Sequence, residues 1–97
     1  MLRRVVVTGL GAVSPNGIGQ KEFWKNTCKG ISGIDRITSF DPVGLACQIA
    51  GEVTNFDSSL YYSAADLKKL PRTVPLAAAA TQEALENAGI DLDNFSE

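Results

Sequence analysis

The chain has 97 residues, of which 44% are hydrophobic and 21% are charged, and its formal net charge at pH 7 is -2. This composition is typical of a globular protein and excludes a disordered or low-complexity chain. The sequence pI of about 5.0 argues against general nucleic-acid binding, which requires a basic face.

Residue types that carry metal or thiol chemistry are scarce. The chain contains 2 cysteines and no histidine, which removes most metal sites and every cysteine–histidine or serine–histidine couple. Cys28 and Cys47 have no CxxC spacing and fall in apolar patterns, so we expect each to behave as a small hydrophobe rather than as a nucleophile. The longest apolar run is too short to span a bilayer, and the first residues lack the apolar core of a signal peptide. We therefore expect a cytoplasmic protein without a membrane span.

The first predicted element is a strand at Val5–Val7. Three consecutive β-branched residues are stiff at χ1 and apolar on both sides of a pleat, which favours a short strand buried on both faces of an α/β layer. A loop with Gly9, Gly11, Gly17 and Gly19 follows. Glycine reaches positive φ without steric cost, so we expect a sharp turn there.

This loop has a second interpretation as a phosphate cradle. The dinucleotide motif GxGxxG, placed after a strand, sets backbone N–H groups against a pyrophosphate. Here the stretch Gly9–Ser14 lacks the third glycine, and Pro15 interrupts the helix that should begin there. The short-chain reductase pattern TGxxxGxG fails as well, because Val13 and Pro15 occupy its glycine positions. We therefore favour a structural turn over nucleotide binding and expect no cofactor.

The middle of the chain predicts a helix, a loop and a strand. Apolar residues at helical spacing indicate a helix over 20–29, with Gly30 as the residue that ends it. Residues 34–40 have a weak strand pattern between turn residues and are interpreted mostly as loop. Residues 47–53 alternate between apolar and polar and predict a half-buried strand that pairs antiparallel.

The last third of the chain predicts two helices. A short one over 64–70 stops at Pro71, and a long one runs over 73–88. The long helix has Thr73 as its expected N-cap, a proline in its first turn and Gly89 after its end. Its stripe of alanine and other small residues allows close packing, so we expect this helix to be buried between layers.

These elements are too few to complete a covered parallel sheet. A strand such as Val5–Val7 needs neighbours on both edges and layers on both faces. The sequence contains no internal repeat, low-complexity tract or linker. We infer that the chain is part of a larger α/β domain.

Several motifs with compatible spacing then point to a known family. They are RRVVVTGLGAVSPNGIG (residues 3–19), Phe23-Trp24, the turn over 30–34, Phe40-Asp41, IAGEV (residues 49–53) and the closing ALENAGI. Together they resemble the amino terminus of β-ketoacyl-acyl carrier protein synthases, closest to the synthase II type of the thiolase-like condensing enzymes. The resemblance covers essentially the whole chain.

The resemblance implies a thiolase-like αβαβα layered fold, of which residues 1–97 would be the first part of the N-terminal half, an incomplete domain. It implies an acyltransferase that condenses an acyl thioester with malonyl-acyl carrier protein by decarboxylation. In that family a cysteine carries the acyl chain and two histidines assist the decarboxylation. The family's catalytic cysteine falls beyond Glu97 and the chain has no histidine, so we expect no catalytic residue and no metal ligand within it.

The resemblance also implies a docking site for the acidic acyl carrier protein. Synthases of this type offer a basic patch just before the long helix, where this chain has Lys68 and Lys69, with Arg72 close by. Three positive charges in five residues can steer an acidic partner, although exposed lysines beside a helix are usually solvated and inert. Ala65 and Leu70-Pro71 depart from the family pattern, which leaves the carrier partner and the subfamily open.

Two hypotheses remain for the chain as a whole. In the first, it is part of an active condensing enzyme whose remaining residues lie beyond Glu97. In the second, it is a truncated chain or partner subunit that only binds carrier protein or a full-length synthase. The resemblance implies an obligate dimer, so we expect a homodimer, or a heterodimer with a related synthase.

Overall fold

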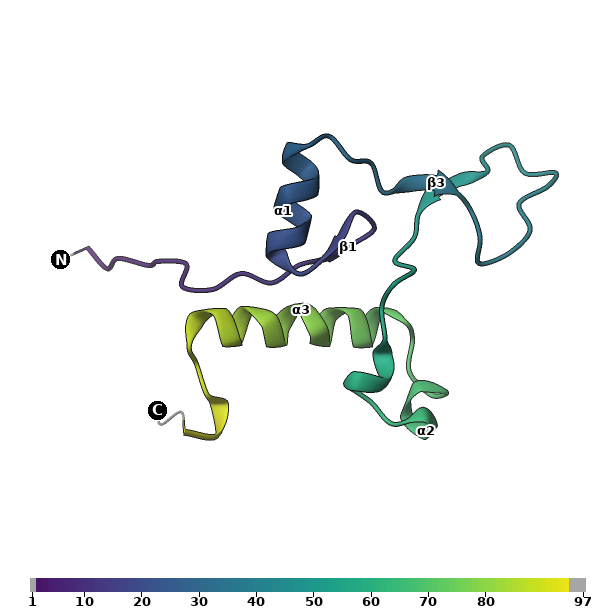
Figure 1. The fold of residues 1–97 in the computed structure, drawn as a ribbon. Helices are drawn as coiled ribbons and strands as arrows, with labels where there is room; N and C mark the ends of the chain where they lie inside the picture. Colours follow the sequence, from purple (N-terminus) through teal and green to yellow (C-terminus); the bar gives the residue numbers. More distant parts are fainter. Residues whose placement is uncertain (1, 95–97) are drawn as a thin grey trace.

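The computed structural model describes residues 2–94 and shows helices and short hairpins joined by long irregular segments (Figure 1). The elements, in chain order, are β1 (Val13–Ser14), β2 (Gly17–Ile18), α1 (Gln20–Cys28), β3 (Ile34–Arg36), β4 (Ile49–Gly51), α2 (Ala64–Leu67) and α3 (Thr73–Ala88), with short 3-10 turns at Ser58–Leu60 and Leu92–Asn94. Strand β1 pairs with β2, and β3 pairs with β4, both antiparallel. The sheets within residues 2–94 are therefore separate two-stranded hairpins.

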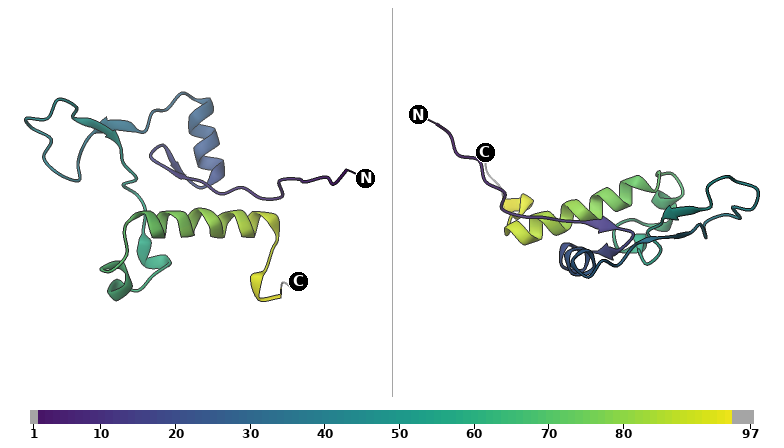
Figure 2. Two further views of the ribbon diagram at one scale, coloured as in Figure 1. Left: turned by 180° about the vertical axis from the view of Figure 1, so that it is seen from behind. Right: turned by 90° about the horizontal axis from the view of Figure 1, so that it is seen from above.

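The N-terminal segment is extended but forms no strand. Around Gly9 and Gly11 it runs beside α3 in the opposite direction, and the start of the chain extends past the end of that helix (Figures 1 and 2). Val5, Val6 and Val7 are 94%, 65% and 81% exposed, so the prediction of a strand buried on both faces is wrong for residues 2–94. The reason is that a strand needs a hydrogen-bonded neighbour, and none of the described segments pairs with these valines.

The glycine-rich loop contains a hairpin that the sequence analysis did not predict. Strands β1 and β2 are joined by a turn at Pro15 and Asn16. The Asn26 side chain donates from Nδ2 to the Asn16 carbonyl oxygen at 2.5 Å, which fastens the turn to α1. Helix α1 begins and ends close to its predicted bounds, and Gly30 follows it with φ 71°, as expected of a glycine that ends a helix.

Residues 34–51 form a hairpin with a long loop, here called the β3–β4 arm, which projects from the rest of the structure (Figures 1 and 2). The antiparallel pairing predicted for the strand at residues 47–53 is confirmed, but within these residues the strand β4 covers only Ile49–Gly51. Its partner is Ile34–Arg36, the start of the segment 34–40 that is interpreted mostly as loop with a weak strand pattern. Residues 37–40 form no strand. The arm packs on the Pro15 turn through Gly51, where a Cβ atom would lie 2.9 Å from Pro15 Cγ.

Helix α3 has the bounds that the sequence predicts. Gly89 ends it in the left-handed conformation with φ 73°. The N-cap, however, is Arg72 and not Thr73, and no side chain caps this end within the described residues.

The close packing expected of α3 occurs on one of its sides. A Cβ atom on Gly11 would lie 1.8 Å from the Ala80 carbonyl oxygen, and one on Gly9 would lie 2.2 Å from that of Ala84. Only glycine therefore fits at these two positions, because any side chain would overlap the helix backbone. The other side of the stripe faces an open groove of about 710 Å³, lined by Tyr62, Val74, Ala77, Ala78, Thr81 and Leu85 among others. Within residues 2–94, α3 is thus covered on the side that faces Gly9 and Gly11 and open on the side of the groove.

Residues 2–94 have almost no hydrophobic core of their own. Within this described part of the chain, Ala79 alone among the hydrophobic residues is buried. The accessible surface is 7829 Å², whereas a folded monomer of 10.3 kDa is expected to expose about 5,400 Å². The radius of gyration is 17.1 Å, against about 12.5 Å for a compact domain of this length. Residues 2–94 are therefore arranged in an open rather than a compact fold. In the part of the chain that is described, no helix is long and apolar enough to cross a membrane.

Candidate functional site

The basic segment over 68–72 links α2 to α3. Ser63 begins α2 as its N-cap, with its Oγ accepting the Asp66 backbone N–H at 3.2 Å. Lys68 is the C-cap of this short helix, and Lys69 follows it in a turn. Both lysines are exposed, and neither side chain holds a hydrogen bond or ion pair within residues 2–94. Their ammonium groups are therefore available to a partner.

Arg72 differs from the two lysines although it is also exposed. Its Nη2 donates a hydrogen bond of 2.7 Å to the Val53 carbonyl oxygen, which follows strand β4. All three predicted docking residues thus lie on one short segment, and of these three, Lys68 and Lys69 have no partner within residues 2–94.

Next to Val53, the Glu52 carboxylate closes the base of the β3–β4 arm. It accepts the Thr38 backbone N–H at 2.8 Å, the Thr38 hydroxyl at 3.0 Å and the Ser39 backbone N–H at 3.0 Å. These hydrogen bonds, led by that from the Thr38 backbone, lower the pKa of Glu52 from 4.5 to about 2, because they favour the ionised carboxylate.

The lowered pKa of Glu52 predicts that the arm is sensitive to acid. The pKa of Glu52 in the folded chain lies below its ordinary value of 4.5. The stabilisation from its hydrogen bonds to Thr38 and Ser39 is therefore fully present above pH 4.5 and is lost as the pH falls toward 2. A carbon-13 NMR titration of the Glu52 side-chain carboxyl should show a midpoint near pH 2, together with movement of the Thr38 and Ser39 amide signals. A midpoint near 4.5 would show that the carboxylate does not hold these groups in solution.

A second carboxylate, that of Glu83 on α3, joins three separate segments. Glu83 Oε1 accepts the Ala12 backbone N–H at 2.9 Å, and its two oxygens accept the Gln20 backbone N–H at 3.1 and 3.0 Å. Gly19, the N-cap of α1, has no side chain to cap that helix. Glu83 therefore caps α1 from a distant part of the chain and fixes the β1–β2 hairpin on α3.

The sequence analysis missed this role of Glu83. The available signal was the helix start after Gly19, which left the first N–H groups of α1 without a local acceptor.

The glycine loop has a packing role in the structure. The space beside Gly9 and Gly11 is filled by the backbone of α3, and the Leu10 backbone N–H donates to Asn87 Oδ1 at 3.1 Å. Close approach of two backbones explains Gly9 and Gly11, which do not form the sharp turn that the sequence predicts. In the dinucleotide motif, the space beside these two glycines would be held by a pyrophosphate. Within this loop the expected positive φ occurs at Gly19, with φ 95°.

Both cysteines are exposed free thiols, which corrects the expectation that they lie on packed apolar faces. For Cys28 the reason is visible in α1, which buries no residue among those described. No cluster of three potential metal-ligating side chains occurs within residues 2–94.

This arrangement of segments matches a known class of enzyme. The solved structure "The ishigamide ketosynthase/chain length factor" is similar to the chain with a TM-score of 0.83 and 35% sequence identity, over 98% of this chain and 24% of that one. The described elements therefore have the fold of the thiolase-like condensing enzymes. Residues 2–97 also match the family "Beta-ketoacyl synthase, N-terminal domain". The chain belongs to the β-ketoacyl synthase family.

Curated relatives come from both fatty-acid and polyketide enzymes. The chain is 42% identical over 93 residues to the tetracenomycin polyketide synthase ketoacyl synthase beta subunit of Streptomyces glaucescens, covering 96% of this chain and 23% of that protein. It is 36% identical over 92 residues to 3-oxoacyl-[acyl-carrier-protein] synthase 2 of Staphylococcus aureus (strain N315), covering 95% and 22%. It is 35% identical over 94 residues to the synthase 2 of Synechocystis sp., covering 97% and 23%. The chain thus spans about a quarter of the length of these relatives.

Proposed function

We propose that residues 1–97 are the N-terminal part of a 3-oxoacyl-acyl carrier protein synthase, as an incomplete domain of that enzyme. The observation that carries this proposal is the family match over residues 2–97 in a chain that spans about a quarter of its relatives. The open structure supports it, because Val5–Val7 and the groove on α3 lack a cover among the described residues. Further chain of the same enzyme would supply that cover.

The proposed reaction is a decarboxylative Claisen condensation in fatty acid or polyketide biosynthesis. An acyl thioester and malonyl-acyl carrier protein are the substrates, so the whole protein is an acyltransferase. The nucleophilic cysteine and the two histidines lie outside residues 1–97 in this proposal, and the chain itself has no histidine. The contribution of residues 1–97 is then structural support and carrier docking. The enzyme works in the cytoplasm as a homodimer, or as a heterodimer with a related synthase.

The docking part of the proposal rests on the basic segment over 68–72. Lys68 and Lys69 are exposed on a turn before α3 and have no internal partner within residues 2–94. The chain as a whole carries a net charge of -2, so these charges are a local basic feature on an acidic protein. An acidic carrier protein is attracted to such a feature over a distance that salt shortens.

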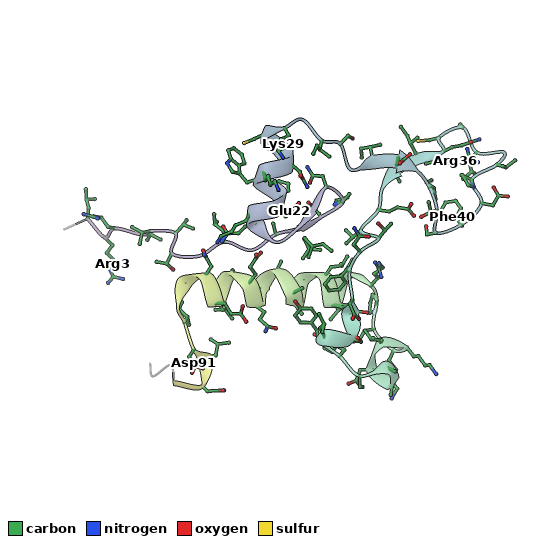
Figure 3. The ribbon with its side chains drawn as sticks, in the orientation of Figure 1. Arg3, Glu22, Lys29, Arg36, Phe40 and Asp91 are labelled. Atoms are coloured by element: carbon green, nitrogen blue, oxygen red, sulfur yellow. The ribbon has the colours of Figure 1, made fainter. Side chains whose placement is uncertain are left out.

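Charge reversal at Lys68 and Lys69 should weaken carrier binding. We expect Lys68→Glu with Lys69→Glu to lower the affinity for acyl carrier protein about tenfold or more at low salt, because attraction becomes repulsion. The measurement is a binding titration with the protein made from its own gene. The matched control is Lys25→Glu on α1 with Lys29→Glu at its C-cap, which makes the same change of charge; Figure 3 labels Lys29 at the end of that helix. Equal affinity of the Lys68/Lys69 variant and the wild type at low salt would remove the docking site.

The alternative is a chain of 97 residues that does not catalyse and only binds carrier protein or a full-length synthase. The similarity to the S. glaucescens beta subunit supports a partner-subunit role as this alternative. The intact mass of the protein made from its own gene separates the two. A mass near 10.3 kDa supports the truncated chain, and a mass about four times larger supports the synthase.

A further inference from the structure

The three basic residues of the docking segment have different local environments. Lys68 and Lys69 project from a turn without internal partners within residues 2–94. Arg72, at the N-cap of α3, donates its Nη2 to the Val53 carbonyl oxygen at 2.7 Å across 19 residues of sequence. An arginine held by a backbone acceptor has lost part of its freedom to turn toward a partner.

The adjacent residues Glu52 and Val53 bond to two different segments of the chain. The neighbouring Glu52 carboxylate holds Thr38 and Ser39 at the base of the β3–β4 arm, and Arg72 holds Val53 from the start of α3. These residues, with Leu76 of α3, line one cavity of about 680 Å³. The space between the arm and α3 is therefore bridged by the Arg72 side chain.

We propose that Arg72 is a positioning residue, which fixes the segment over 68–72 against the end of β4, and that Lys68 and Lys69 alone are the docking charges. This inference rests on the proposed carrier docking and refines it. Docking of an acidic partner then depends on Arg72 through the orientation of the two lysines and not through its own charge. A rigid segment presents the lysines in one arrangement, so less entropy is lost when the partner binds.

The two roles predict different results for Arg72→Lys and Arg72→Gln. The Arg72–Val53 contact is a single hydrogen bond from Nη2. Lysine keeps the charge, but its shorter side chain ends before the position of Nη2, whereas glutamine removes the charge. A positioning role predicts that both variants weaken carrier binding by a similar factor, about threefold to tenfold, and leave its salt dependence unchanged. A docking charge predicts that Arg72→Lys binds like the wild type and that Arg72→Gln flattens the salt dependence.

The experiment is a carrier-protein titration over a series of salt concentrations, with the protein made from its own gene. Lys68→Gln and Lys69→Gln provide the comparison and should weaken binding and flatten its salt dependence. If these lysine variants bind like the wild type, the proposed docking site fails whatever Arg72 does. If they weaken binding while Arg72→Lys behaves like the wild type, or while neither Arg72 variant has an effect, the docking site stands and the positioning role is overturned.

Discussion

Residues 1–97 produced without further chain should show no cooperative unfolding transition. Their surface of 7829 Å² exceeds that of a folded monomer of this mass by about 2,400 Å², and Ala79 is the buried hydrophobic residue of the described part. The burial of apolar surface is the dominant favourable contribution to folding, so little of it opposes the loss of chain entropy. We expect a scanning calorimetry trace without a heat-absorption peak, and binding of an apolar dye.

The control for this prediction is the protein made from its own gene. If that protein is about four times larger, its calorimetry trace should contain a cooperative peak and dye binding should fall. A sharp transition in the 97-residue chain alone would contradict the prediction. It would also support the alternative of a free-standing truncated chain, because such a chain must be stable by itself.

Replacement of Glu83 should be among the most destabilising changes on α3. Its carboxylate accepts backbone N–H groups of Ala12 and Gln20, and these donors lose their acceptor in Glu83→Ala. Hydrogen bonds to a charged group are worth about 1.5 to 3 kcal/mol each, so we expect a loss of about 2 kcal/mol or more in the free energy of unfolding. Glu83→Gln keeps one acceptor oxygen and should lose less.

The measurement is denaturant unfolding of the protein made from its own gene, with amide hydrogen exchange at Ala12 and Gln20 as the local readout. Glu86→Ala is the matched control, because Glu86 lies one turn further along α3, is exposed and accepts only from Gln82 Nε2, at 3.1 Å, among residues 2–94. Such an exposed pair within one helix contributes about 0.2 to 0.5 kcal/mol. Similar losses for Glu83→Ala and Glu86→Ala, with unchanged exchange at Ala12 and Gln20, would contradict the capping role.

The site could be predicted from the sequence in part. Charge and position placed Lys68, Lys69 and Arg72 on one segment before the long helix, and the structure has them there. Their pattern in the sequence cannot reveal that Arg72 bonds to Val53, because that contact joins residues that only the fold brings together. The same applies to Glu83, whose two backbone donors lie far from it in the sequence.

The sequence by itself determined the elements whose signals are local, and the family. Helix α3 runs from Thr73 to Ala88 as predicted, because periodicity and Gly89 are properties of neighbouring residues. Only the tertiary structure decided that Gly9 and Gly11 lie against the α3 backbone, and that β4 pairs with residues interpreted as loop. The strand expected at Val5–Val7 could not be decided from the sequence either, because a strand exists only when a neighbour completes its hydrogen bonds. No such neighbour occurs among residues 2–94.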